Sequence, residues 1–166
     1  MRLTLGTKVN YPAQGPCSIG PIIEKLVGGH SVAFYQLAIL DESGGTLFLP
    51  LNSVKTSGLR LLLKRDEIPG LLAHLKQSET PAKDWKQRAR DNSRRLTSGS
   101  AMDLVEVIGS LTELSETKQL SFRESGMLNK ARRLLVTEIS EVLKETRAAA
   151  DNQVGEALKG LRLAKI

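Results

Sequence analysis

The amino-acid sequence predicts an α+β protein of two domains, with a small SH3-like β barrel over residues 1–62 and a compact all-α domain over residues 63–166. Two observations support this division. Short apolar runs between glycine and proline turn signals fill the first part, and their apolar residues alternate as they do in strands. Apolar residues at helical spacing, preceded by residues that favour helix starts, fill the second part. Strands precede helices without alternating with them, which argues against a parallel α/β sheet.

The N-terminal domain is expected to contain four or five short strands. Gly28 and Gly29 supply the positive φ angles of a tight hairpin turn. Pro12 and Pro50 end two of the runs, because proline has no N–H to donate to a β ladder. A barrel of this size has little room for an internal active site, so its usable surfaces are loops and an exposed strand edge. The expected strands cover residues 8–11, 19–27, 31–40 and 46–49.

Helix-start and helix-end residues divide the C-terminal domain. Asp66 is expected to cap a short helix that ends near Gln77, followed by a linker over residues 78–82. A second helix is expected over residues 82–97, and it ends before Gly99.

Two capping boxes are expected to open the longer helices. Ser100 stands three residues before Asp103, and Ser121 stands three residues before Glu124. At this spacing the serine hydroxyl accepts a hydrogen bond from the backbone of the later residue. A weaker signal predicts a last helix over residues 151–163. Together these elements predict one compact helical domain.

The net charge of +6 is concentrated in one short segment. Residues 81–100 hold six basic residues against Asp84 and Asp91, a net charge of +4, whereas residues 101–166 hold ten of each sign. A local excess of positive charge indicates a polyanionic partner, and the alternative is an ordinary solvated helix face. The basic residues are Lys83, Lys86, Arg88, Arg90, Arg94 and Arg95.

The single tryptophan, Trp85, lies near the start of this basic segment. On a helix, Lys86, Arg90 and Arg94 stack one turn apart, and Trp85 with Arg88 lies beside that row. Two interpretations stay open. Trp85 either anchors the helix against its neighbours, or forms an exposed aromatic wedge that stacks on bases while adjacent cations hold phosphates. Neither interpretation predicts base-specific reading in the major groove.

The sequence shows no complete catalytic motif. Residues 15–20 have the glycine spacing of a phosphate loop, but Pro21 stands where such a loop needs its lysine. Cys17 could act as a nucleophile only with His30 as its base, and His30 is expected to be a solvated residue beside a turn. His74 is expected on the surface. We therefore expect a protein without catalytic residues, metal or cofactor.

Hydropathy and cysteine usage bear on location. No apolar run is long enough for a signal peptide or a membrane span, and a single cysteine allows no disulfide within the chain. These observations predict a soluble cytoplasmic protein, and we expect a monomer.

A series of short motifs runs through both domains. In the N-terminal domain they are Gly6-x-x-Val9-x-Tyr11-Pro12-x-x-Gly15, Phe34-Tyr35-x-Leu37, Leu49-Pro50 and Ser57-Gly58-Leu59-Arg60. In the C-terminal domain they are Trp85 with the basic residues after it, Ser98-Gly99, Leu120-Ser121-x-x-Glu124 and Met127-Leu128-x-x-Ala131-Arg132-x-Leu134-Leu135. In their order and spacing, these motifs resemble the CarD/CdnL family of bacterial RNA polymerase-binding proteins along nearly the whole chain.

The resemblance implies a Tudor-like N-terminal barrel, also found in transcription-repair coupling factors, that pairs with the β subunit of RNA polymerase. Its polymerase-facing residues would include Lys25 and the run Leu47, Phe48 and Leu49. The resemblance also implies that Trp85 enters the minor groove of promoter DNA at the upstream edge of the melted bubble and hinders collapse of the open complex. The residues expected to contact the DNA backbone are Lys86, Arg88, Arg90 and Arg94.

Two departures from the family pattern concern these sites. Phe48 stands where some relatives have an arginine, so part of the polymerase contact would be apolar here. Residues 121–126 replace a Gly-Glu-Arg/Lys pattern that is common in the family. Gly126 lies within this helix start, and a glycine there costs about 1 kcal/mol relative to alanine.

The function we expect is regulation of transcription initiation, with the protein joined to the nucleoid through RNA polymerase. Two alternatives stay open. An RNA- or ribosome-associated barrel would bind RNA tightly without polymerase. A stand-alone architectural DNA-binding protein would bind DNA through its helical domain alone.

Overall fold

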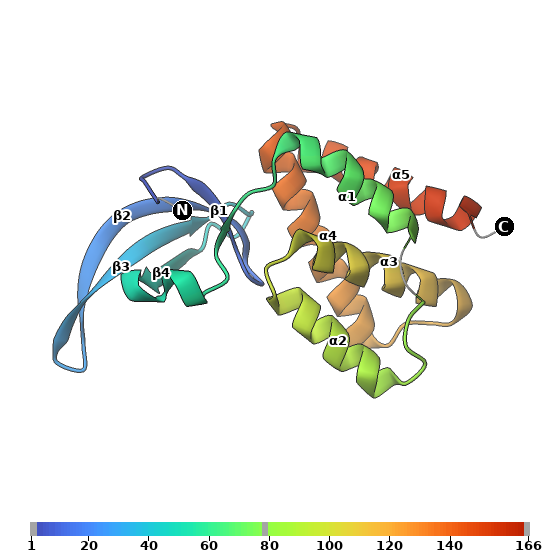
Figure 1. Cartoon of the computed structure of the whole chain (residues 1–166), viewed down its shortest axis with the longest axis horizontal. Coiled ribbons are helices and arrows are strands. Elements are labelled where there is room, and N and C mark those ends of the chain that lie inside the picture. Colours follow the sequence, from blue (N-terminus) through green and yellow to red (C-terminus); the bar gives the residue numbers. More distant parts are fainter. Residues whose placement is uncertain (1–2, 78–79, 165–166) are drawn as a thin grey trace.

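The computed structural model describes residues 3–77 and 80–164, with side chains described up to residue 160. A curved antiparallel sheet forms one end of the molecule and a bundle of helices forms the other (Figure 1). The predicted α+β class, with strands first and helices second, is confirmed. Part of the predicted 78–82 linker, Ser78 and Glu79, lies outside the described residues.

Five strands form a single sheet in the order β4-β3-β2-β1-β5. Among the described strands, β4 and β5 have a neighbour on one side only, so they are the two edges of the sheet. The side chains enclosed by its curvature include Val9, Cys17 and Leu37, which form a small apolar core. The strands are β1 (Lys8–Tyr11), β2 (Gly15–Val27), β3 (His30–Ile39), β4 (Thr46–Pro50) and β5 (Arg60–Leu61).

The hairpin of β2 and β3 is the longest feature of the sheet (Figure 1). Gly28 and Gly29 form its turn with φ angles of 58° and 81°, as the sequence predicts. The β2 strand begins at Gly15, four residues earlier than expected, because its first residues pair with β1. A register shift between Ile19 and Ile22 interrupts the pairing with β3, and irregularities of this kind bend a strand.

The helical domain is built around α3 and α4. Their core residues Val105, Ile108, Leu111 and Leu135 are fully buried. No described helix has the length and apolarity needed to cross a membrane. The helices are α1 (Ile68–His74), α2 (Trp85–Thr97), α3 (Ala101–Thr117), α4 (Phe122–Leu143) and α5 (Arg147–Ala164). Short 3-10 turns cover Leu51–Thr56, Arg65–Glu67 and Leu75–Gln77.

In both predicted capping boxes the serine caps the start of a helix as expected. The Ser100 hydroxyl accepts from the Asp103 amide at 3.2 Å, and the Ser121 hydroxyl accepts from the Glu124 amide at 3.1 Å. The prediction that Asp66 caps the first short helix is wrong. The neighbouring Glu67 carboxylate accepts instead from the Lys64 N–H, at the start of the 3-10 turn that precedes α1.

Two other helix starts differ from expectation. Helix α2 begins at Trp85 rather than at residue 82, because the Asp84 carboxylate caps it by accepting from the Lys86 amide at 3.2 Å. Helix α5 begins at Arg147 rather than at residue 151. There the Thr146 hydroxyl accepts from the Ala149 amide at 3.1 Å and satisfies an N-terminal N–H.

A buried carboxylate joins the two domains. Glu138 of α4 is fully buried, and its two oxygens accept from the Arg60 guanidinium at 2.6 and 2.9 Å. One of them also accepts from the Leu63 amide at 2.9 Å. The Arg60 Nε atom donates to the Gly99 carbonyl at 2.6 Å, which ties the turn between α2 and α3 to the same cluster. We call Arg60, Glu138, Leu63 N–H and Gly99 C=O the junction cluster.

Close backbone contact surrounds the junction cluster. Gly58 and Gly99 have φ angles of 80° and 85°, and both lie against the ring of Pro12. A methyl group on Gly58 would stand 2.8 Å from the Pro12 Cγ atom, so only glycine fits.

Three further ion pairs connect the N-terminal part of the chain with α4 and α5. Lys8 pairs with Glu141 at 2.8 Å. Arg147 pairs with Glu42 at 3.2 Å and donates to the Leu40 carbonyl, while Arg133 lies 3.6 Å from Asp41. Contacts on several sides hold the sheet and the helical bundle in one relative orientation.

We expect Glu138→Ala to lower the free energy of unfolding by about 2–4 kcal/mol, because it leaves Arg60 and the Leu63 N–H without their acceptor. Urea unfolding followed by circular dichroism measures this loss. Glu141→Ala is the control, since its ion pair with Lys8 is partly exposed and is expected to contribute less than about 1 kcal/mol. Equal losses in the two variants would contradict a special role for the buried carboxylate.

Candidate nucleic-acid interface

Trp85 is the first residue of α2, and 63% of it is exposed to solvent. The interpretation in which Trp85 anchors the helix against its neighbours is therefore wrong. The Asp84 cap fixes the backbone immediately before it, and the Lys86 ammonium lies 5.7 Å from the centre of the indole ring. An exposed indole on an ordered helix end can stack against an apolar or aromatic surface of a partner.

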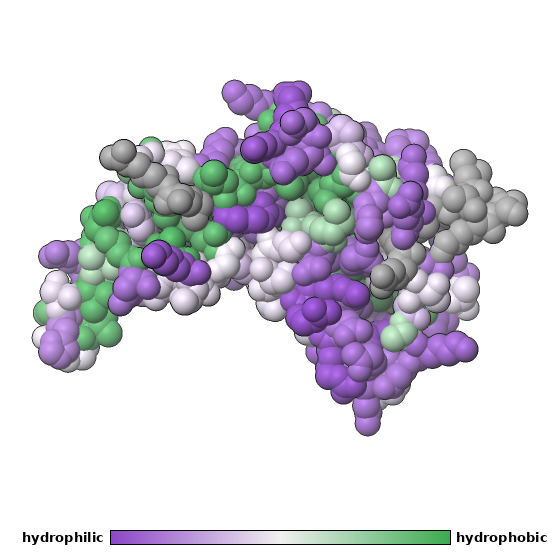
Figure 2. Space-filling view, in the orientation of Figure 1, coloured by the Kyte–Doolittle hydropathy of each residue, from purple (hydrophilic) through white to green (hydrophobic). Residues whose placement is uncertain are grey.

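Lys86, Arg90 and Arg94 follow Trp85 along one exposed face of α2, and we call this row the basic stripe. Arg90 is held by a hydrogen bond of 2.9 Å to the Gln87 side chain. Figure 2 shows strongly hydrophilic side chains gathered over the lower part of the molecule, where α2 lies in Figure 1. The row predicted from helical spacing is present on the surface.

Arg88 is not part of this surface, and its assignment as a DNA contact is corrected. It is only 6% exposed and points toward α4, where its Nε atom donates to Glu124 at 3.0 Å. Its Nη1 atom donates to the carbonyls of Ala82 and Lys83, each at 2.9 Å. A guanidinium that is buried and bonded in this way positions the start of α2 and has no free face for a phosphate.

The partner of Arg88 is held in its charged form. Burial by itself would raise the pKa of Glu124, but the hydrogen bond and charge of Arg88, with hydrogen bonds from Ser121, outweigh it and lower the pKa from its ordinary value. A carboxyl whose folded-state pKa is lowered stabilises the fold at neutral pH. That contribution disappears as the pH falls through the folded-state pKa.

Arg123 was missed by the sequence analysis. It is exposed in the first turn of α4 and donates to the Ser93 hydroxyl of α2 at 3.3 Å. With Trp85, Lys86 and Arg90 it lines a shallow hollow of about 450 Å³. Charge counting within residues 81–100 could not include a cation that follows a separate helix and loop.

The predicted polymerase-facing residues lie on the edge strand β4 and its surroundings. The Lys25 ammonium lies 3.6 Å from the centre of the Phe48 ring, and Phe48 is 43% exposed. Leu47 is partly buried against the sheet core. Leu49 is only 4% exposed, so the expectation that its side chain faces a partner is wrong. Alternation along β4 turns Leu49 inward and Phe48 outward.

The nucleophile and base considered in the sequence lie far apart. Cys17 is fully buried and opposite Ile39, near the root of the hairpin, whereas His30 stands at its tip opposite Val27. Burial, with a smaller effect from the charge of Asp41, raises the pKa of the Cys17 thiol to about 11. His74 is half-exposed and lies 2.6 Å from Glu106. In the described parts of the chain, no group of His, Cys, Asp and Glu residues could hold a metal ion.

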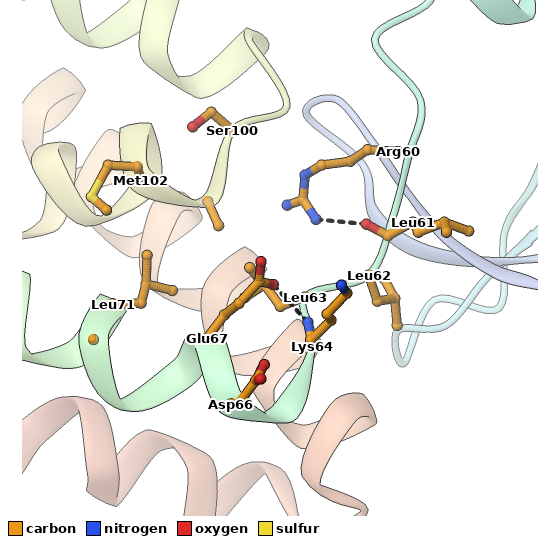
Figure 3. A pocket seen from close by; sticks show the side chains of 12 residues that line it. Arg60, Leu61, Leu62, Leu63, Lys64, Asp66, Glu67, Leu71, Ser100 and Met102 are labelled. Carbon is orange, nitrogen blue, oxygen red and sulfur yellow. Dashed lines mark hydrogen bonds between the residues drawn. The ribbon is translucent and has the colours of Figure 1, made fainter. Parts of the chain in front are cut away.

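A larger hollow of about 700 Å³ lies where the chain passes from the sheet to the helices (Figure 3). Two of its charged side chains, Arg60 and Glu67, already have partners within the chain. The Arg60 guanidinium donates to the Leu61 carbonyl at 3.1 Å and to Glu138, and the Glu67 carboxylate accepts from the Lys64 amide at 2.7 Å. We assign this hollow to the junction between the domains.

Comparison with known proteins gives three similarities. The family model "CarD, C-terminal domain" matches residues 70–155, which are 86 of the 166 residues. "Putative transcription factor YdeB" of Bacillus subtilis is 25% identical over 141 residues, covering 84% of this chain and 91% of that protein. The N-terminal domain of Myxococcus xanthus CarD, solved by NMR, is 32% identical over 36% of this chain and 79% of that chain, with a TM-score of 0.30.

We expect Arg88→Ala to lower the free energy of unfolding by about 1–3 kcal/mol, because the Glu124 carboxylate loses its cationic partner and two backbone carbonyls lose their donor. Arg94→Ala, on the exposed side of the same helix, is expected to change it by less than about 0.5 kcal/mol. Urea unfolding at neutral pH compares the two variants. If the two variants were equally stable, the bonds of Arg88 would not stabilise the fold, and Arg88 would again be a candidate DNA contact.

Proposed function

The chain belongs to the CarD/CdnL family of transcription regulators, and from this premise we propose that it acts on RNA polymerase at promoters. In this proposal the edge strand β4 pairs with the β subunit of the polymerase. Trp85 then enters the minor groove at the upstream edge of the melted bubble and stabilises the open complex.

One observation carries the proposal: the indole of Trp85 is exposed at an ordered helix start, beside the basic stripe. Aromatic and apolar wedges inserted between base steps need the bases to be partly unstacked, and the edge of a melted bubble already provides this. Stacking on a base contributes about 1–3 kcal/mol. Beside the indole, the exposed cations Lys86, Arg90 and Arg94 are available to contact phosphates next to the base on which Trp85 stacks.

The electrostatic part of such a contact does not depend on DNA sequence. Each phosphate neutralised by a lysine or arginine releases counterions, so binding weakens as salt rises. The logarithm of the binding constant falls with the logarithm of the salt concentration, with a slope of about −0.9 per phosphate contact. The basic stripe and Arg123 therefore support DNA binding that is weak, sensitive to salt and largely independent of DNA sequence. An interaction of this strength needs a second contact to deliver it to promoters.

The edge strand β4 is suited to be that second contact. Its outer side has no partner strand among the described residues, so its backbone can be extended by a strand from another protein. Phe48, stacked under Lys25, adds an exposed apolar side chain with a fixed orientation. Because Phe48 replaces an arginine of some relatives, we propose that this part of the polymerase contact is apolar.

The regulatory effect follows from differential binding. A protein that binds the open complex more tightly than the closed complex shifts the equilibrium toward the open state. A difference of about 1.4 kcal/mol changes the ratio of open to closed complexes tenfold. One stacked indole supplies a difference of this size. Activation or repression then depends on which step limits initiation at the promoter.

We expect Trp85→Ala to shorten the lifetime of the open complex by about five- to tenfold relative to wild type, because the stacking contact is lost. Decay of preformed complexes after heparin challenge measures this lifetime. Trp85→Phe is the matched control and should retain part of the effect, while both variants still co-purify with polymerase. Wild-type lifetimes with Trp85→Ala would exclude the wedge.

We expect Phe48→Ala to weaken binding to RNA polymerase at least about fivefold, because a hydrophobic side chain of this size contributes more than 1 kcal/mol when it is buried in an interface. Co-purification with core polymerase measures this loss. Leu26→Ala is the control, since Leu26 is 80% exposed on the same domain but lies near the hairpin tip. Unchanged binding by Phe48→Ala would exclude this edge, and tight RNA binding without polymerase would favour the RNA-associated alternative.

A further inference from the structure

Phe122 is the first residue of α4, and 97% of it is exposed to solvent. An isolated apolar side chain on a surface is common and has no meaning by itself. This one follows the Ser121 cap directly, so its backbone position is fixed by the helix start. Its neighbours are what distinguish it.

The first turns of α4 and α2 lie side by side. The Arg88–Glu124 ion pair joins them at 3.0 Å, three residues after Trp85 and two residues after Phe122. The bond from Arg123 to the Ser93 hydroxyl, at 3.3 Å, joins the first turn of α4 to the third turn of α2. The two strongly exposed aromatic residues of the helical domain therefore begin adjacent helices that are locked to each other.

The surface between them is positively charged. Arg123 shares the hollow of about 450 Å³ with Trp85, Lys86 and Arg90. The neighbouring carboxylates are engaged within the chain. Asp84 caps α2, Asp91 accepts from Gln87 at 2.8 Å, and Glu124 is paired with Arg88.

We infer that Phe122 and Arg123 form a second part of the DNA-contacting surface, which binds unpaired DNA next to the position of Trp85. Phe122 stacks on a base of the single strand, and Arg123 holds the adjacent phosphate. A phenyl ring has no polar edge with which to read a groove, but it stacks on any unstacked base. Exposed aromatics among cations are the usual composition of single-strand binding surfaces.

This inference rests on the proposed function and makes it more specific. Trp85 would mark the last paired step of the DNA, and Phe122 would mark the first unpaired base. The site as a whole would then recognise a fork, which is duplex DNA that opens into single strands. Positive charge alone would not prefer a fork over a duplex of equal charge.

The test uses the full chain and two fluorescein-labelled DNA probes at low salt, a forked duplex with an unpaired arm and a blunt duplex of the same total length. Fluorescence anisotropy gives the affinity for each probe. We expect Phe122→Ala to lower the affinity for the fork by about five- to twentyfold and to leave the affinity for the blunt duplex within about twofold. Phe122→Trp should keep the preference for the fork, and Phe122→Leu, which is apolar but cannot stack, should lose it.

Two controls separate this surface from its surroundings. Met102→Ala removes an apolar residue that is 42% exposed at the start of α3 and lines the larger hollow of Figure 3, and it should change neither affinity. Arg123→Gln should weaken binding to both probes and reduce the salt slope by about one. Because Phe122 is almost fully exposed, urea unfolding should find its variants as stable as wild type.

The outcomes distinguish this inference from the proposed function. If Trp85→Ala loses affinity for the fork and Phe122→Ala does not, the second contact is wrong and the wedge stands. If Phe122→Ala weakens both probes equally, stacking on an unpaired base is wrong. If neither aromatic residue affects either probe or the lifetime of the open complex, the inference and the proposed function both fail.

Discussion

The contact between Arg60 and the buried carboxylate of Glu138 is the interaction on which the arrangement of this molecule depends. Glu138 lies in the middle of the long helix α4 with no exposed surface, and a charge there is tolerated only because three donors satisfy it. Arg60 is the first residue of the edge strand β5, and it also donates to the Gly99 carbonyl in the turn between α2 and α3. The bond to Gly99 ties the C-terminal end of α2 to the sheet, while the Arg88–Glu124 pair ties the start of α2, where Trp85 lies, to α4.

A second arginine–carboxylate pair shapes the proposed binding surface in a less direct way. Arg88 belongs by sequence to the most basic part of the chain, yet it is buried against Glu124. Its charge cancels that of a carboxylate which would otherwise lie beside the cations of α2 and α4. A basic residue can therefore strengthen an anion-binding surface by neutralising an acid beneath it, without touching the anion.

The sequence predicted those features that depend on local chemistry. The capping serines Ser100 and Ser121 and the glycine turn at Gly28 lie where expected, because caps and tight turns depend on a few adjacent residues. Residues whose role depends on a distant element were predicted less well. Arg88 looked exposed because a polar helix gives no sign of which face meets α4, and Arg123 escaped notice because it joins the basic stripe only in three dimensions.

The junction between the domains also has an entropic consequence. A chain with two binding surfaces on one stiff body behaves as a bivalent ligand, so that capture of the first surface presents the second at a high effective concentration. A flexible linker would lower that effective concentration, whereas the junction cluster and the Pro12–glycine contact favour one orientation of the second surface. In the proposed function, weak binding to DNA would then suffice, and the DNA could be released without breaking a strong interaction.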